Sequence, residues 1–399
     1  VLGTGAARDT LLYQEDDDAY ELDLAKTRSR RFLLIRASQT LANEVRLAPA
    51  DAPAGPWRVF QPRERGLEYA VDHLGGRFVV RTNLAARNFR LVECGQTDTG
   101  KQHWRDLVPH RSDVFVEDFT LFDDFLVVQE RRGGLSRLHM RPWRGPGEHD
   151  LDFGEPTYGT ALAPTPEPGT VVLRYEYSSL STPRSVFDYD MRSRTRILRK
   201  QDRVLGGFDP ARYRTEYLRA MAADSTQVPI SLVYRPDRFV PGRNPCLLYG
   251  YGSYGIPWDA TFESWLLSLL DRGFVFGIAH VRGGGELGRA WYEDGKLTKV
   301  LEAGRYEIPK QRRWFQRLPT VECVVVDIRE RDLTIKGQEI LTADKVAIRV
   351  SILVQYRVID AKAAIQNVEN YEERLYSDVQ LAARRSLASM NLEEILTNR

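Results

Sequence analysis

Cysteine is scarce in this chain. Three cysteines occur in 399 residues, and Cys94, Cys246 and Cys323 lie far apart without any Cys-x-x-Cys spacing. A sparse, odd count argues against a disulfide framework, and the absence of paired spacing argues against a zinc site. We therefore expect a protein without structural metal or cofactor, in a reducing compartment such as the cytoplasm.

The sequence also lacks a strong net charge and a long apolar run. Its 57 Lys and Arg residues nearly balance its 55 Asp and Glu residues, whereas dedicated nucleic-acid binders carry a concentrated basic excess. We interpret the short basic clusters 28–31 and 310–317 as solvated loops, so no nucleic-acid partner is predicted. No stretch approaches the roughly 18 apolar residues of a membrane span, and no signal peptide is recognisable.

Residues 1–200 instead contain a repeat of short strand patterns separated by Gly, Pro, Asp and Asn. Similar apolar runs start at Phe32, Phe78, Phe125 and Val171, so successive starts lie 46, 47 and 46 residues apart. A second strand pattern follows each run after a polar turn. A constant period of about 45 residues is typical of β-propeller blades. We predict about four blades of a propeller that is truncated at its N-terminus, with a β-sandwich as the alternative.

Residues 201–297 change to a different pattern. Two strand patterns lie at 213–221 and 228–234, and a short apolar strand follows at 245–250. Residues 262–270 then show a helical spacing of Phe, Trp and Leu, and residues 274–281 form a mostly apolar run. A run of the last kind is expected for a strand covered on both faces. The order strand, helix, strand predicts the start of an α/β sheet.

Residues 298–399 change again, to an α+β pattern. Strand patterns at 321–329, 333–335 and 346–358 precede an amphipathic helical pattern over 361–390. Asn391 is a plausible N-cap for a last helix. We interpret Glu372, Glu373, Glu393 and Glu394 as solvated helix faces rather than a catalytic pair.

Several ordered motifs resemble the oligopeptidase B branch of the prolyl-oligopeptidase family. The clearest are Tyr249–Gly255 (YGYGSYG), His280–Gly288 (HVRGGGELG) and Trp291–Lys296 (WYEDGK). The resemblance implies a seven-bladed propeller on an α/β-hydrolase domain that cleaves short peptides after Lys or Arg. It also implies that Tyr251 donates its hydroxyl to the oxyanion, a type of contact worth about 3–4 kcal/mol of barrier. The alternative is a loop tyrosine that only packs.

The catalytic triad of that family is not found in the sequence. Acyl transfer on this fold needs a serine in a Gly-x-Ser-x-Gly turn, followed by Asp and then His. Ser253 comes closest to this pattern, but Tyr251 stands where the first glycine is needed. His280 is the only histidine after residue 240, and it precedes the expected position of the turn. The residues therefore predict no peptidase activity for the chain as written.

The glycines of the second motif allow one rival interpretation. Gly283–Gly288 satisfies Gly-x-Gly-x-x-Gly after a predicted strand, which is the dinucleotide fingerprint. No long helix follows, and no later strand ends in an acidic residue at the expected distance. We favour a loop that is shaped by glycine, near a hydrolase active site.

Beyond Leu297 the motifs resemble those of the stomatin/prohibitin (SPFH, band 7) family. They include Val300–Tyr306 (VLEAGRY), Gly337–Asp344 (GQEILTAD) and Asn370–Glu373 (NYEE). The resemblance implies an oligomeric scaffold rather than an enzyme, and membrane attachment only for the parent protein. The second hypothesis for function is therefore a scaffold or interaction protein that forms homo-oligomers through 298–399.

The expected fold class is thus multidomain: a partial β-propeller over 1–200, a truncated α/β-hydrolase over 201–297, and a truncated SPFH-type α+β domain over 298–399. The chain begins at Val1 rather than at methionine and stops just past a helical pattern, so we expect both ends to be cut. Asp294–Leu297 ends the resemblance to the peptidase family, and Gly295–Leu297 is also a plausible lead-in to the second family. We favour a recombination or assembly artefact at this join, with a working fusion as the alternative.

Overall fold

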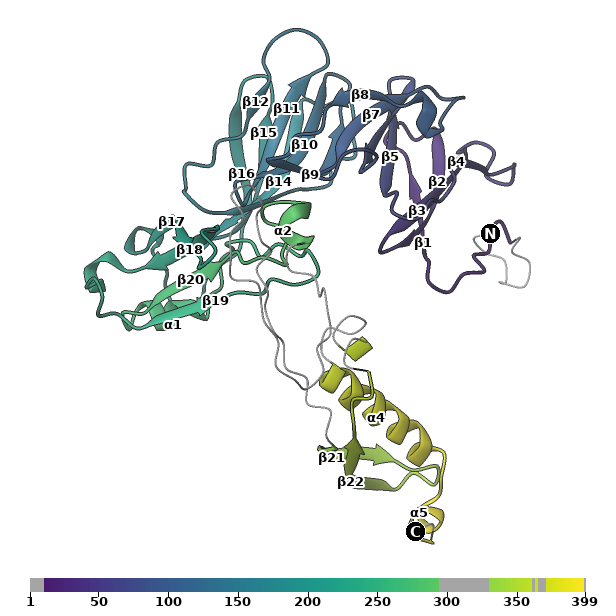
Figure 1. The fold of residues 1–399 in the computed structure, drawn as a ribbon, viewed down its shortest axis with the longest axis vertical. Coiled ribbons are helices and arrows are strands. Elements are labelled where there is room, and N and C mark those ends of the chain that lie inside the picture. Colours follow the sequence, from purple (N-terminus) through teal and green to yellow (C-terminus); the bar gives the residue numbers. More distant parts are fainter. Residues whose placement is uncertain (1–10, 294–329, 361–362, 365–370, 398–399) are drawn as a thin grey trace. The chain divides into compact units, whose positions relative to one another are not determined.

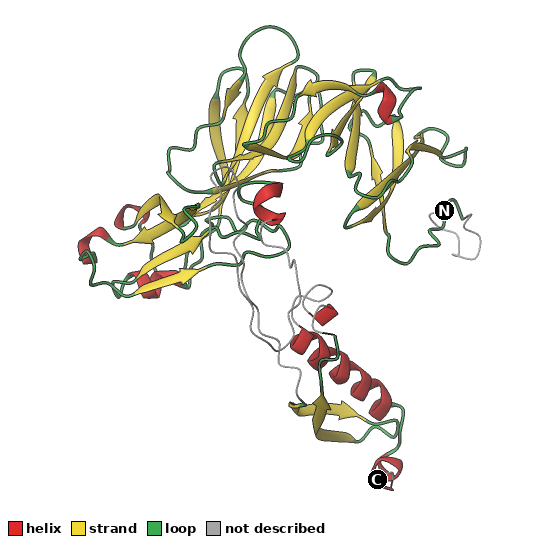
Figure 2. Cartoon of the chain, viewed as in Figure 1, coloured by secondary structure: helices red, strands yellow, loops and turns green. Residues whose placement is uncertain are grey.

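The computed structural model describes residues 11–293, 330–360, 363–364 and 371–397. The chain divides into two compact units, Val1–Gly295 and Lys296–Arg399. Figure 2 shows that the first unit is built mainly of strands with a few short helices. Each unit is described by itself below.

Four antiparallel sheets of four strands each occupy the N-terminal part of the first unit (Figure 1). Their strands, in chain order and sheet by sheet, are β1 (Glu21–Lys26), β2 (Phe32–Gln39), β3 (Ala42–Pro49) and β4 (Arg58–Gln61); β5 (Tyr69–Leu74), β6 (Arg77–Thr82), β7 (Arg90–Cys94) and β8 (Arg105–Val108); β9 (Val114–Leu121), β10 (Phe125–Arg132), β11 (Leu135–Pro142) and β12 (His149–Asp150); β13 (Gly159–Leu162), β14 (Val172–Ser179), β15 (Thr182–Asp190) and β16 (Thr195–Gln201).

These sheets confirm the repeat that the sequence predicts. The four repeated runs coincide with the second strand of each sheet, namely β2, β6, β10 and β14, and the patterns after them coincide with the third strands. Neighbouring sheets are joined by contacts of β3 with β5, of β5 and β6 with β9, and of β11 with β13. Meandering four-stranded sheets that pack in sequence are propeller blades.

The cores of this part lie between neighbouring blades. One cluster joins the first two blades and contains Leu34, Leu47, Phe60 and Phe78, each 2% exposed or less. The rings of Phe60 and Phe78 meet edge to face with centroids 5.1 Å apart. Because alternate residues of each strand point to opposite faces, every blade can contribute to the core on either side of it.

The rest of the first unit is a mixed sheet in the order β17-β18-β20-β19. Strands β17 (Arg214–Met221) and β18 (Gln227–Tyr234) are antiparallel, whereas β19 (Cys246–Tyr249) and β20 (Val275–Ala279) are parallel. Helix α1 (Leu266–Leu270) connects the parallel pair, and α2 (Arg289–Glu293) follows β20. The predicted strand, helix, strand order is confirmed. Helix α1 starts later than the apolar spacing from Phe262 predicts, and Phe262, outside the helix, packs against Phe208.

The described residues of the second unit include a hairpin and the helices α4 and α5. Strands β21 (Arg331–Leu341) and β22 (Ala347–Tyr356) pair antiparallel, and α4 (Tyr371–Ala388) contacts β21. The predicted strand 321–329 and most of 361–370 lie outside the described residues. Helix α5 (Leu392–Thr397) begins where Asn391 donates its backbone N–H to Glu394 Oε2 at 2.9 Å, which is half of a capping box.

Two of the glutamates expected on solvated helix faces also accept hydrogen bonds. Glu394 closes the start of α5, and Glu372 accepts hydrogen bonds from Arg331 and, at 3.0 Å, from the Tyr356 hydroxyl. Glu372 therefore ties α4 to the hairpin, a contact that helical spacing alone could not show. None of the described helices is both long and apolar enough to cross a membrane.

Candidate active site

The candidate site is built on the carboxyl ends of β19 and β20. Because these strands are parallel, the segments that follow them, 250–255 and 280–288, leave the sheet at the same edge. Ligands of open α/β sheets bind at such an edge. The two motifs of the sequence analysis are therefore brought together by the fold.

Glycines hold the two segments against each other. Gly252 has a φ of +62°, and a Cβ added there would lie 2.5 Å from Val281 Cγ2 and 2.7 Å from the Arg282 oxygen. A Cβ added at Gly283 would collide with the Gly252 carbonyl. Gly255 donates its N–H to the Gly283 oxygen at 2.8 Å. A side chain at these positions would force the segments apart.

The same contacts bear on the dinucleotide interpretation. The space over Gly285 is taken by the Gly255 carbonyl, and the space over Gly288 is taken by the Asn88 side chain. The described part of helix α2 is Arg289–Glu293. The glycines thus admit neighbouring protein atoms at the positions where the fingerprint would admit a pyrophosphate.

Tyr251 lies in the first segment, directly after β19. Its ring packs against Trp258 with centroids 5.8 Å apart, and Trp258 also contacts Tyr249 at 5.0 Å. This aromatic group holds the loop that carries the hydroxyl. The role of Tyr251 as an oxyanion donor stays a prediction.

His280 follows β20 and is 1% exposed. Its Nε2 lies 2.8 Å from the Ser231 hydroxyl, which is 2.6 Å from the Thr157 hydroxyl. Its backbone N–H donates to the Pro229 oxygen at 2.9 Å. His280 therefore belongs to a buried network that links β18, β20 and the segment before β13.

Glu286 is a buried acid that the sequence analysis did not identify. It is 2% exposed, its Oε1 accepts a hydrogen bond from the backbone N–H of Trp258 at 3.0 Å, and the same oxygen lies 3.8 Å from His280 Nδ1. Among the residues that the structure describes, neither Glu286 Oε2 nor His280 Nδ1 has a hydrogen-bond partner. The only sequence signal was a lone carboxylate within a glycine run. Glu286 positions Trp258 and, through it, the Tyr251 ring.

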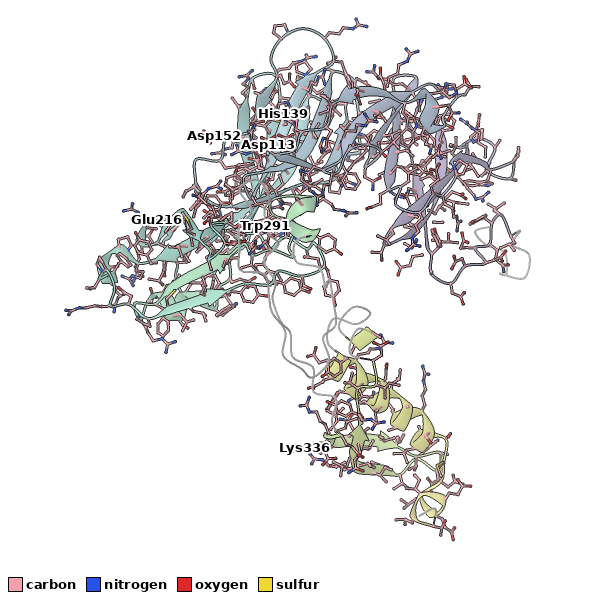
Figure 3. The ribbon with its side chains drawn as sticks, viewed as in Figure 1. Asp113, His139, Asp152, Glu216, Trp291 and Lys336 are labelled. Atoms are coloured by element: carbon pink, nitrogen blue, oxygen red, sulfur yellow. The ribbon has the colours of Figure 1, made fainter. Side chains whose placement is uncertain are left out.

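Ion pairs connect the propeller blades to the segments that form this site. Arg131 on β10 is 3% exposed and donates to Asp259 Oδ1 at 2.6 Å and to Glu117 Oε1 at 2.8 Å. Burial by itself lowers the pKa of Arg131, but the two carboxylates outweigh it and raise this pKa overall. Arg289 of α2 pairs with Glu68 of the second blade. Figure 3 labels Trp291 on α2, whose Nε1 donates to the Val281 oxygen at 2.9 Å.

Three family profiles match the chain. The prolyl oligopeptidase N-terminal β-propeller domain matches residues 1–202, and the prolyl oligopeptidase family matches residues 260–302. The SPFH domain/Band 7 family matches residues 284–399. The last two matches overlap over 284–302, a range that contains the predicted join at Leu297.

Known proteins agree with these profiles. The chain is 44% identical over 303 residues to "Dipeptidyl aminopeptidase BI" of Pseudoxanthomonas mexicana, which covers 75% of this chain and 42% of that protein. It is 31% identical over 301 residues to "Protease 2" of Moraxella lacunata, with coverages of 74% and 42%.

Among solved structures, oligopeptidase B from Leishmania major matches with a TM-score of 0.68 and 35% identity, over 74% of this chain and 43% of that one. The chain thus spans less than half the length of the relatives it matches. The predicted resemblances and fold class are confirmed by these matches. The chain therefore belongs to the prolyl oligopeptidase family, as the propeller profile over 1–202 and the 44% identical relative show, and its residues 284–399 also match the SPFH/Band 7 family.

Proposed function

We propose that residues 1–297 are the propeller and the first part of the catalytic domain of a serine oligopeptidase. The observation that carries this proposal is the Tyr251 loop, held at the carboxyl edge of the sheet by the glycine contacts and by Trp258. A hydroxyl fixed before the reaction stabilises the oxyanion without reorganisation during the reaction. The triad itself would have to come from residues that this chain does not contain.

The proposed substrates are short peptides cleaved after Lys or Arg, as the oligopeptidase B resemblance implies. A second specificity is supported by the 44% identical relative, whose name describes removal of dipeptides from an N-terminus. An Arg-containing fluorogenic peptide with a blocked N-terminus separates the two, because a dipeptidyl aminopeptidase requires a free amine.

A graft tests the proposal. Residues 1–297 are joined to the part of the Pseudoxanthomonas mexicana relative that follows the matched segment. We expect the graft to hydrolyse an Arg peptide and to react with a fluorophosphonate. Tyr251→Phe should lower kcat by about 10²–10³-fold, because it removes one oxyanion donor. Tyr254→Phe removes a hydroxyl from the same loop at a position that the resemblance does not assign to the oxyanion, so kcat should fall far less than in Tyr251→Phe.

The native chain is the negative control for the graft. We propose that it neither hydrolyses peptide nor reacts with fluorophosphonate, since no Gly-x-Ser-x-Gly occurs in it. An acyl-enzyme on any serine of the native chain would refute that part of the proposal. A folded graft without activity would refute the peptidase assignment.

A second candidate function is an oligomeric scaffold, which the SPFH/Band 7 match over 284–399 supports. We expect assemblies well above the monomer mass of 45.7 kDa in size-exclusion chromatography with light scattering. A monomer at all concentrations tested would contradict this function. A cytoplasmic location is also proposed, supported by the sparse cysteines; fractionation of cells tests it.

A further inference from the structure

A small cavity lies at the amino ends of β19 and β20. It has a volume of about 260 Å³ and is lined by residues of two segments, 238–245 before β19 and 272–273 before β20. Because the two strands are parallel, the Tyr251 loop leaves the sheet at the opposite edge. Strand β19 has four residues, so the two edges are about 13 Å apart along it. The cavity is therefore separate from the candidate active site.

Arginine supplies all the charge in the lining of this cavity. No acidic residue lines it, whereas three exposed arginines do: Arg238, Arg243 and Arg272. None of the three forms an ion pair with another residue that the structure describes. The acids beside them in the sequence, Asp237 and Asp271, pair instead with the buried Arg235, at 2.6 and 2.8 Å. The cavity thus gathers positive charge that no described carboxylate compensates.

Hydrogen bonds hold the two lining segments together. Asn244 Nδ2 donates to the Arg238 oxygen at 2.8 Å and to the Gly273 oxygen at 2.7 Å. The guanidinium of Arg272 is also oriented, because its Nε donates to the Ser268 oxygen at 2.9 Å. Its two terminal nitrogens have no hydrogen-bond partner among the described residues, so they are available to a ligand. Groups that are held before binding lose less conformational freedom when a ligand arrives.

The number of arginines favours a phosphate group over a carboxylate as the ligand. A guanidinium binds either group through two parallel hydrogen bonds. A carboxylate carries a single negative charge on two oxygens, so one arginine already matches it. A phosphate monoester has three acceptor oxygens and a charge of about −1.5 to −2 at pH 7, so it can engage several guanidinium groups at once.

We propose that the cavity lined by residues of 238–245 and 272–273, called here the arginine cavity, binds the phosphate monoester of a small molecule. The phosphate is carried either by a soluble compound or by a lipid head group. The volume suits a compact ligand, since drug-sized ligands occupy about 300–1,000 Å³. Val240 also lines the cavity and is 51% exposed, so it can contact the carbon atoms next to the phosphate. This site does not depend on the proposed peptidase function, and an inactive graft would leave it untouched.

Glycerol 3-phosphate is the probe for the soluble source. We expect it to bind the full 399-residue chain at one saturable site in isothermal titration calorimetry, with an affinity that falls as salt is added. Vesicles of phosphatidylcholine and phosphatidic acid present the same phosphate monoester on a lipid. Vesicles with phosphatidylglycerol at equal charge are their control, because that phosphodiester has fewer free oxygens. A preference for phosphatidic acid in co-sedimentation would identify the lipid as the source, and calorimetric binding alone would identify the soluble compound.

Matched variants locate the site. Arg243→Gln and Arg272→Gln should each weaken binding by about tenfold or more, because each removes hydrogen bonds between a cation and the phosphate. Arg65→Gln changes an exposed arginine between β4 and β5 that has no ion pair among the described residues, and it should leave the affinity unchanged. Thermal unfolding of each variant shows whether it is folded as the native chain is.

The proposal is overturned if glycerol 3-phosphate shows no saturable binding and the vesicles show no preference for phosphatidic acid. Equal affinity of the native chain and of folded Arg243→Gln and Arg272→Gln variants would also overturn it, because the phosphate would then bind elsewhere. Tighter binding of a glutamate-rich peptide would make a carboxylate the ligand, and tighter binding of a phosphoserine peptide would make a protein the partner. Either result contradicts a small phosphate monoester as the ligand.

Discussion

At the scale of single residues, His139 on β11 gives the propeller a pH-dependent contact (Figure 3). Its Nδ1 lies 2.6 Å from Asp150 and its Nε2 lies 2.8 Å from Glu148. The hydrogen bond to Asp150 raises the pKa of His139, burial opposes this, and the contact with Glu148 adds to it. The same bond with His139 is the main cause that lowers the pKa of Asp150 to about 2.

The signs of these shifts define a pH window. Because the pKa of His139 is higher in the folded than in the unfolded chain, its contacts stabilise the fold fully at pH values below the unfolded pKa of about 6.5. This stabilisation is lost as the pH rises through the pKa of the folded state. The lowered Asp150 pKa stabilises the fold above about 4, and that gain is lost as pH falls towards about 2. The contact is therefore strongest between about pH 4 and 6.

His139→Gln should consequently cost more stability at about pH 5.5 than at about pH 8.5. At the lower pH we expect a loss of about 1.5–3 kcal/mol, the range for hydrogen bonds to charged groups. Urea denaturation at both pH values measures the difference. His110→Gln, on an exposed loop, is the control; an equal loss for His139→Gln at both pH values would contradict the argument.

At the scale of elements, the stability of the blades depends on the side chains of each strand that pack against a neighbouring blade. Leu34 on β2 is 2% exposed in the cluster between the first two blades, whereas Leu24 on the adjacent strand β1 is 67% exposed. Leu34→Ala should lower the free energy of unfolding by about 2–5 kcal/mol, because it leaves a cavity. Leu24→Ala should cost less than about 0.5 kcal/mol. Similar losses for the two variants would mean that this packing does not stabilise the blade.

At the scale of the whole first unit, Arg131 couples the third blade to the segment between β19 and α1 through Asp259. Arg131→Met leaves Asp259 and the largely buried Glu117 without their cation, so we expect a loss of about 3–5 kcal/mol. Arg192→Met, which breaks a solvent-exposed pair with Asp124, should cost at most about 1 kcal/mol. Thermal and urea unfolding measure both. An Arg131 variant as stable as the Arg192 variant would show that the blade contact does not hold this segment.

Local patterns in the sequence determined the repeating blades, the strand, helix, strand order and the glycine segments around Tyr251. Turn signals, the two-residue period of strands and glycine at crowded positions all act over a few neighbouring residues, so they can be read before the chain is folded. The tertiary structure alone decided the pairings between distant residues: Arg131 with Asp259, Glu286 with Trp258, and Glu372 with Arg331. Their energies depend on burial and on distance in space, which the winding of the blades and the pairing of β19 with β20 create, and which spacing along the chain does not contain.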